Sequence, residues 1–232
     1  MFTRFIFCFF LVALLPACGG EDAATPAPEP TPSPQPQPTP PDRAMTDQEA
    51  VRLLLQASFG PTDGSVENVA EIGAEAWLEA QFASPVTEHL PLLNSTFPGD
   101  EIYSHHWVEI WWQRSIYADD QLRQRVAFSL SQIFVVSTKD ARLLVDPRGV
   151  TSYYDTLLTH SFGNFRDLLE AVTLHPMMGM YLSMLGNEKP DAERNIRPDE
   201  NFAREVMQLF TIGLVELNQD GSVVTDSQGN PV

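Results

Sequence analysis

The sequence predicts a mainly α-helical domain of several helices, with a β-hairpin near the end of the chain. Apolar side chains recur at helical spacing through most of residues 46–212. Residues that start or stop helices stand at the ends of these periodic segments. Beyond Gly213 the spacing of apolar residues changes to two, which is typical of strands.

The first expected helices have clear boundaries. Thr46, with Glu49 three residues later, forms a capping box, and Gly60 and Pro61 end the helix that it opens. A second apolar pattern follows, and the next segment, residues 85–99, is rich in turn formers, which predicts a loop. The expected helices are 46–59, 65–82, 102–117, 119–134, 149–160, 165–174, 176–185 and 198–212.

The later helices differ in character. The segment 102–117 is aromatic almost all round, which predicts a helix that is buried on most sides. Asp119 and Asp120 begin the next helix, since the helix dipole favours acids at an N-terminus. Pro198 starts the last helix and Gly213 stops it. The apolar stripe expected for residues 119–134 is Leu122, Val126, Leu130, Ile133 and Phe134.

A turn sequence predicts the hairpin. Residues 214–217 and 222–225 flank Gln219-Asp220-Gly221. The chain then stops just after another turn sequence, Gly229-Asn230. We therefore expect the helical domain, residues 43–232, to be the N-terminal part of a longer domain.

The N-terminus predicts export. Arg4 is followed by an apolar run from Phe5 to Leu15, too short to span a ~30 Å hydrocarbon core as a helix. The next residues, up to Cys18, resemble the bacterial lipobox, which implies a signal peptide over residues 1–17 and lipid on Cys18. Gly19, in place of the aspartate that retains lipoproteins at the inner membrane, favours the outer membrane. The alternative is a plain secretory peptide with an incidental cysteine.

Residues 18–42 are expected to form a lipidated stalk. Proline fills nearly every second position from Thr25 to Pro41, so this segment should adopt polyproline II and reach roughly 50 Å. The domain beyond it has no cysteine, so packing without disulfides must stabilise it.

Charge excludes some partners. The net charge of −17 argues against nucleic acid and against adhesion to anionic lipid, because both need basic patches. Twelve of the fourteen basic residues are arginines, and we expect them to form pairs with carboxylates between helices.

The densest polar cluster lies on the last expected helix. Helical geometry places Glu205 at the edge of the buried face, with Asn201 on the same flank. Glu205 is either a ligand or general base oriented by Asn201, or a structural partner of an arginine such as Arg123, Arg125 or Arg166. The candidate binding residues are Arg204, Arg166 and Glu200.

Two histidines are the other candidates for catalysis. His160 and His175 each close an expected helix, where the C-terminal dipole favours them. If they converge with Glu205, two imidazoles and a carboxylate would suit zinc or iron. No nucleophile elbow, phosphate loop, dinucleotide-binding glycine pattern or His-Glu-x-x-His motif is present.

Several segments together resemble the bacterial family called "domain of unknown function 1800", from about Thr46 to the end of the chain. The resemblance implies a mostly helical exported protein, and a co-encoded exported family of unknown function (number 1501) is a candidate partner. The resemblance does not imply any particular reaction. The segments are Arg52 to Gly60, Leu122 to Phe128, Phe162 to Leu169, His175 to Met178 and Pro198 to Gly213.

The chain departs from the family pattern at four positions. Many members carry His-Asn-His where this chain has Ser131-Gln132-Ile133, and a further histidine where it has Phe210. This departure counts against a histidine-rich metal site in this chain.

Two functions are compatible with these features. The first is an envelope lipoprotein whose helical domain binds a partner protein or a surface polymer. The second is a hydrolase acting on an extracytoplasmic polymer through Glu205 with His160 or His175, and it requires these side chains to face one pocket.

Overall fold

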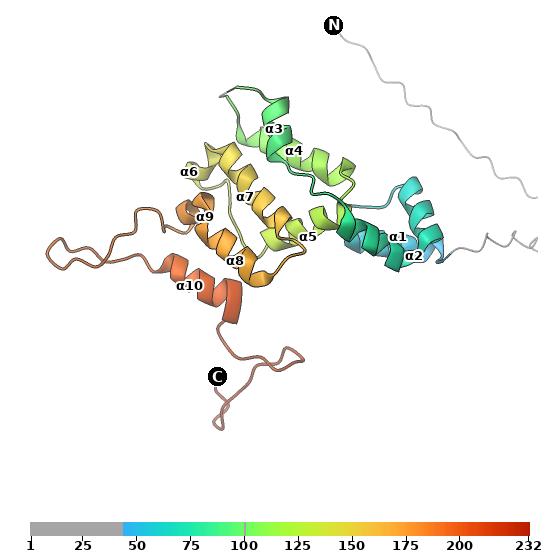
Figure 1. Ribbon diagram of the computed structural model, residues 1–232. Coiled ribbons are helices and arrows are strands. Elements are labelled where there is room, and N and C mark those ends of the chain that lie inside the picture. Colours follow the sequence, from blue (N-terminus) through green and yellow to red (C-terminus); the bar gives the residue numbers. More distant parts are fainter. Residues whose placement is uncertain (1–43, 100) are drawn as a thin grey trace, which may run out of the picture. The chain divides into compact units, whose positions relative to one another are not determined.

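The computed structural model describes residues 44–99 and 101–232 (Figure 1), within a single compact unit, Pro40–Val232. The expected signal peptide, Cys18 and the stalk lie outside the described residues. Within them, no helix is both long enough and apolar enough to cross a membrane.

The described part is mainly helical, as the sequence predicts. The α-helices are α1 (Asp47–Ala57), α2 (Asp63–Ala83), α3 (Leu90–Thr96), α4 (Ser104–Tyr117), α5 (Gln121–Ser131), α6 (Ala141–Leu144), α7 (Pro147–Thr159), α8 (Phe165–Leu174), α9 (Pro176–Tyr181) and α10 (Asn201–Met207). A π-helical turn, η1 (Gln208–Ile212), continues α10 and ends at Gly213. The φ of Gly213 is 76°, a conformation that glycine adopts with little strain.

Helix α7 is the centre of the domain. It contacts α3, α4, α5, α6, α8 and α9, and Figure 1 shows it between α4 and α8. Val150, Tyr153 and Leu157 point from one side of α7 into the largest core cluster, with residues of α8, α9 and α10. Tyr154 and Leu158, on another side, pack with Ala127 of α5. This helix is therefore buried on several sides, and its polar side chains need partners inside the protein.

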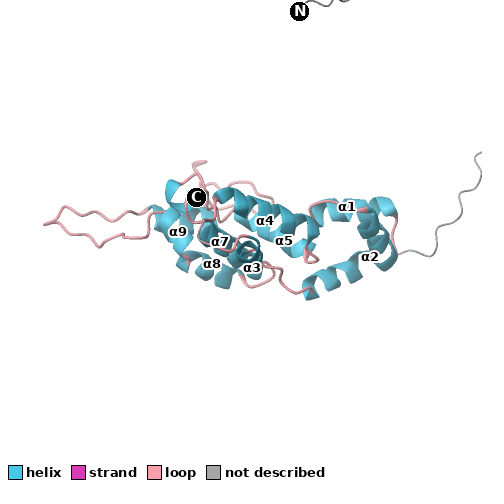
Figure 2. Ribbon diagram, turned by 90° about the horizontal axis from the view of Figure 1, so that it is seen from above, coloured by secondary structure: helices cyan, strands magenta, loops and turns pink. Residues whose placement is uncertain are grey.

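Helices α1 and α2 form a smaller cluster at one end of the domain (Figure 2) and pack against α5. The Thr46–Glu49 capping box is present, with the Thr46 N–H donating to Glu49 Oε2 at 2.9 Å. Helix α2 is broken at Gly73, whose φ is 83°. An added Cβ there would lie 3.0 Å from the Ala44 Cβ, so this position needs glycine for both its conformation and its close approach.

Several predictions about the helices are wrong. Residues 85–99 are not wholly loop, because they contain α3, and the short α6 was not expected. Helix α4 is not buried on most sides, since only Ile110 and Ser115 are buried along it. The buried residues of α5 are Arg123, Gln124 and Ala127. Of the predicted stripe, Phe134 is buried and Leu122 and Leu130 pack against core clusters, but Ile133 is exposed. The last helix begins at Asn201 instead of Pro198.

The predicted hairpin is not formed by strands. Residues 44–99 and 101–232 contain isolated β-bridges, including Leu217 with Val223, but no strand. The turn itself is present, with the Gly221 N–H donating to the Asn218 carbonyl oxygen at 2.9 Å. Leu214 and Leu217 are exposed, so these segments have no apolar face against which a sheet could pack.

Candidate functional site

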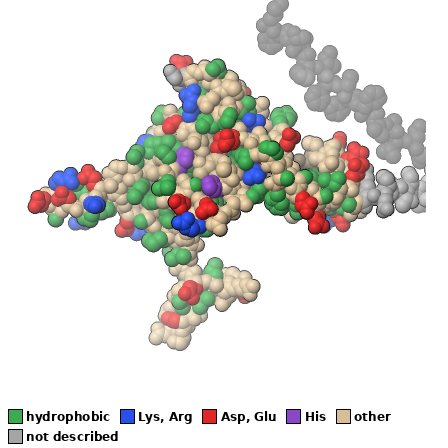
Figure 3. Space-filling model, in the orientation of Figure 1, with side chains coloured by type: hydrophobic (Ala, Val, Ile, Leu, Met, Phe, Trp, Pro, Cys, Tyr) green, Lys and Arg blue, Asp and Glu red, His purple; other side chains and the backbone are tan. Residues whose placement is uncertain are grey.

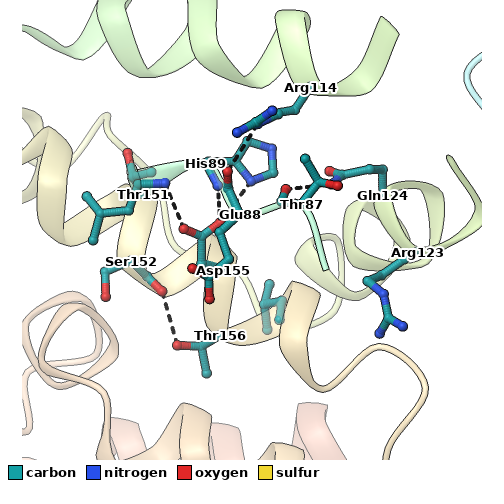
Figure 4. Close-up of polar contacts among 12 residues, drawn as sticks. Thr87, Glu88, His89, Arg114, Arg123, Gln124, Thr151, Ser152, Asp155 and Thr156 are labelled. Carbon is teal, nitrogen blue, oxygen red and sulfur yellow. Dashed lines mark hydrogen bonds and ion pairs between the residues drawn. The ribbon is translucent and has the colours of Figure 1, made fainter. Parts of the chain in front are cut away.

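Two buried carboxylates hold the connector between α2 and α3, residues 84–89, in place. Asp155 of α7 accepts three hydrogen bonds, from His89 N–H at 2.9 Å, His89 Nδ1–H at 2.8 Å and Leu90 N–H at 2.8 Å. Figure 4 shows the His89 ring and the Asp155 carboxylate pointing toward each other. Because the connector has no strand or helix to pair with, these bonds satisfy its amides.

The other carboxylate comes from α5. Asp120 accepts from the Thr87 N–H at 3.0 Å, and Gln124 Nε2 donates to the Thr87 carbonyl oxygen at 3.0 Å and to Asp120 Oδ1 at 3.2 Å. Arg123 lies over the Phe162 ring, 4.3 Å from its centroid. The inward position of Gln124 is thus explained by the connector, and that of Arg123 by the Phe162 ring.

A cavity of about 580 Å³ lies beside this network, between α3, α7 and the junction of α8 with α9. His160 and His175 both line it, together with Ser152, Asp155 and Thr156 of α7. Figure 3 shows histidine side chains at the surface over α7. The structure therefore brings the two predicted histidines to one cavity, together with a carboxylate that the sequence analysis did not single out.

The hydrogen bonds of His175 fix its chemistry. Its Nδ1 accepts the Met177 N–H at 3.2 Å and so caps α9, which leaves the proton of the neutral ring on Nε2. Nε2 lies 3.5 Å from Ser152 Oγ and faces it as a donor. Burial lowers the pKa of His175 and keeps the ring neutral. In this tautomer His175 can neither take a proton from Ser152 nor bind a metal through Nε2.

The other predicted site residues lie elsewhere. Glu205 and Asn201 do not line the histidine cavity, and within the described residues no hydrogen bond or ion pair is formed by the Glu205 carboxylate. Glu200 and Arg204 pair with each other on the exposed face of α10. Arg166 pairs with Glu170 on α8 at 3.0 Å. The expected convergence of Glu205 with the histidines is therefore not found.

The arginine pairs are local. Every arginine–carboxylate pair among residues 44–99 and 101–232 joins residues no more than six positions apart, such as Arg194 with Glu188. The expectation of arginine pairs between helices is wrong for this part of the chain. Instead, His89 Nδ1 and Asp155 Oδ1, 2.8 Å apart, form the long-range contact between a basic and an acidic side chain in the described part of the chain.

A second hollow is an aromatic groove of about 470 Å³ between α4, α5, α7 and the loop after α5. Its lining contains no acidic or basic side chain. Its aromatic residues are Trp107, Trp111, Trp112, Phe128, Phe134, Tyr153 and Tyr154, and its polar residues are Ser131, Gln132, Ser137 and Thr138. The aromatic residues that were expected to bury α4 thus line a surface that solvent can reach.

The two tyrosines of the groove are poor acids. Burial raises the pKa of Tyr154 to about 12, and it also raises the pKa of Tyr153, whose hydroxyl donates to the Phe134 carbonyl oxygen at 2.7 Å. Neither phenol would ionise near neutral pH. The groove can bind a ligand by contact and by neutral hydrogen bonds, but it offers no general acid, general base or charged group.

No three histidine, cysteine, aspartate or glutamate side chains of the described segments come together in a way that could hold a metal ion. A protein-family model described as "Protein of unknown function (DUF1800)" matches residues 52–227. The chain belongs to this family. No curated protein and no solved structure matches the chain.

The groove of this DUF1800 protein has uncharged polar residues where α5 ends. Ser131 and Gln132 line it. Phe210 of η1 packs on Phe134, which lines the groove, with ring centroids 5.1 Å apart. This part of the groove is therefore neutral and partly apolar.

Sequence reasoning missed His89, Asp155 and the groove. One signal could have revealed Asp155: it is the one acidic residue of the segment 150–158, among Val150, Tyr153, Tyr154, Leu157 and Leu158, which predicts a carboxylate buried with a partner. No local pattern points to His89, because its partner lies 66 residues away.

Proposed function

We propose that this chain is a cell-envelope lipoprotein whose helical domain is a binding module for an uncharged surface polymer. Lipid on Cys18 would anchor the module to the outer membrane, and the proline-rich stalk would hold it away from the membrane surface. The observation that carries the proposal is the composition of the groove, which is aromatic and neutral with no acidic or basic side chain.

Binding fits the groove better than catalysis does. Hydrolysis of a glycosidic or peptide bond needs a positioned acid, base, nucleophile or metal. The groove contains tyrosines whose pKa is raised and neutral hydroxyl and amide groups. Its size and its aromatic lining with a few polar groups are those of sites that bind small ligands or short segments of larger ones.

The net charge supports an uncharged ligand. At −17 the chain repels anionic polymers, and the groove has no lysine or arginine that could offset that repulsion. A cationic ligand would find no carboxylate in the groove. An uncharged polymer avoids both penalties.

The second candidate is a hydrolase of an extracytoplasmic polymer, favoured by the cavity that His160 and His175 share with Asp155. Against it, His175 presents a proton to Ser152 and Asp155 is occupied by three donors. Cleavage of an envelope polymer by the purified protein, lost on His175→Asn, would replace the binding proposal with this one.

Two measurements test the proposal. In growing cells, radiolabelled palmitate should label the full chain and not Cys18→Ala, and the label should follow the outer-membrane fraction. Absence of label on the wild type would refute the lipid anchor.

Binding is tested on the mature chain, residues 18–232, with Cys18→Ser to prevent lipidation. The protein should sediment with envelope fragments of the bacterium that makes it, and Trp112→Ala in the groove should reduce the bound fraction. Tyr117→Ala is the matched control, because Tyr117 is also an exposed aromatic residue of α4 but does not line the groove. Equal loss in both variants, or no sedimentation of the wild type, would refute the groove as the binding site.

A further inference from the structure

We infer that the polymer bound in the groove is a neutral glycan, with a sugar ring stacked on Trp112 and hydroxyl groups bonded at the Ser131–Gln132 edge. This inference rests on the proposed function of the groove and adds the chemical class of its ligand. Three properties carry it: an exposed but fixed indole, a neutral hydrogen-bonding edge and the lack of charge.

Trp112 offers a ring face to a ligand. Its side chain is 54% exposed and lines the groove. It meets Trp111 edge to face, with centroids 4.9 Å apart and planes at 78°. Trp111 in turn packs against Phe59 and Phe128, with centroids 5.5 Å and 5.7 Å away. The exposed indole is therefore held by an aromatic support, which reduces the entropy lost when a flat ligand face binds.

The stack suits a sugar ring. One face of a pyranose carries mainly C–H groups, which are weakly positive, and the face of an indole is negative. Stacking of this kind tolerates different rings and leaves the hydroxyl groups at the ring edge free to form hydrogen bonds. A glycan therefore presents both the apolar face and the polar edge that this groove can accept.

The polar edge supplies neutral donors and acceptors. Ser131 Oγ donates to the Phe128 carbonyl oxygen at 2.7 Å and accepts from Gln132 Nε2 at 3.2 Å. These bonds hold the Gln132 amide beside the groove, and its oxygen can accept a hydrogen bond from a sugar hydroxyl. Ser137 and Thr138 add hydroxyl groups at the groove.

Other occupants fit less well. An apolar peptide or an acyl chain would cover the hydroxyl and amide groups of the edge without offering hydrogen-bond partners, which weakens binding for each group left unpaired. A phosphorylated or acidic polymer would bring charge to a groove without cations. The combination of aromatic face and neutral polar edge favours sugars over both.

The test uses the mature chain with Cys18→Ser and envelope fragments from the producing bacterium, divided into three portions. One portion is untreated, one is oxidised with periodate, which cleaves the vicinal diols of sugars, and one is digested with proteinase K. Each treatment is quenched and the fragments are washed before the protein is added. We expect binding to untreated and protease-digested fragments and a loss of binding after periodate.

Three variants localise the effect. Trp112→Ala should weaken binding to untreated fragments about tenfold, as expected for the loss of one aromatic stacking contact. Trp112→Phe should retain part of it, because it keeps a ring face. Gln132→Ala should weaken binding less than Trp112→Ala, and Tyr117→Ala should leave it unchanged.

The outcomes separate the two proposals. If the wild type does not bind untreated fragments, the proposed function fails. If it binds them but keeps that binding after periodate, or loses it after protease digestion, the groove binds something other than a neutral glycan and this inference is overturned. Full binding by Trp112→Phe and Trp112→Ala alike would also overturn the stacking contact.

Discussion

Replacing Asp155 by asparagine tests the central polar contact of the domain. The carboxylate uses Oδ1 for two donors of His89 and Oδ2 for the Leu90 N–H. Asparagine keeps one oxygen, and in its better orientation that oxygen faces His89. Its NH₂ group then faces the Leu90 N–H, so two donors oppose each other.

The expected loss can be built from these bonds. Asp155→Asn removes one hydrogen bond to a charged acceptor, worth about 1.5–3 kcal/mol, and weakens two others from charged to neutral. We expect the free energy of unfolding to fall by about 2–4 kcal/mol, and Tm by roughly 2–4 °C for each kcal/mol in a domain of this size. Asp155→Ala, which leaves all three buried donors unpaired, should cost more.

The assay is urea unfolding followed by both tryptophan fluorescence and far-UV circular dichroism. Asp167→Asn is the matched control, since the Asp167 side chain is 61% exposed on α8 and should change stability by less than about 0.5 kcal/mol. A result for Asp155→Asn that lies as close to the wild type as the control would refute the reasoning, because it would mean that the connector does not depend on this carboxylate.

Three further substitutions have defined outcomes. Burial lowers the pKa of His175 below its ordinary value of 6.5. The contribution of the neutral ring to stability should therefore be complete above pH 6.5 and be lost as the pH falls through the folded-state pKa. His175→Asn, which keeps a cap for α9, should flatten this dependence when unfolding is measured at a series of pH values. Gly149→Ala should destabilise by about 1–3 kcal/mol, because the new Cβ would lie 2.6 Å from Met177 Sδ, whereas Gly179→Ala, with open space around it, should be neutral or stabilising by calorimetry. Glu205→Gln should change the urea midpoint little, because the Glu205 carboxylate forms no hydrogen bond or ion pair within the described residues. A large fall in the midpoint would contradict this description of Glu205.

The helices were predictable where local rules decide them. The capping box at Thr46 and the stop at Gly213 depend on residues a few positions apart, and the structure contains both. Helix α3 was missed because Pro91 and the turn formers around it are typical of loops, although proline is well tolerated in a first helical turn.

The predictions of which residues are buried failed where burial depends on contacts between segments far apart in the sequence. The period of apolar residues on α5 pointed to a stripe that includes Ile133, yet Ile133 is exposed and Gln124 turns inward, where it donates to the Thr87 carbonyl oxygen of the connector. That need is invisible in the sequence of α5 alone. The aromatic composition of α4 likewise indicated burial, whereas three of its tryptophans line a groove instead.

The candidate site was predictable only in part. His160 and His175 were singled out as helix ends, and the bend of the chain at each of them brings both to one cavity. Glu205 was chosen for its place on its own helix, and a helical wheel contains no information about what lies opposite. Convergence of side chains from different helices depends on tertiary packing, which one sequence does not encode in local spacing.

The connector also sets an order for folding. Its amides depend on Asp120 and Asp155, which follow their partners Thr87 and His89 by 33 and 66 residues. Helices α1 and α2 can pack against each other as soon as both have formed. Residues 84–89 have no hydrogen-bond partners until α5 and then α7 are present. If the chain leaves a translocation channel N-terminus first, α1 and α2 would therefore pack together while residues 84–89 still lack their hydrogen-bond partners. Such long-range closure slows folding, so we expect the core around the connector to form only after α7 is available.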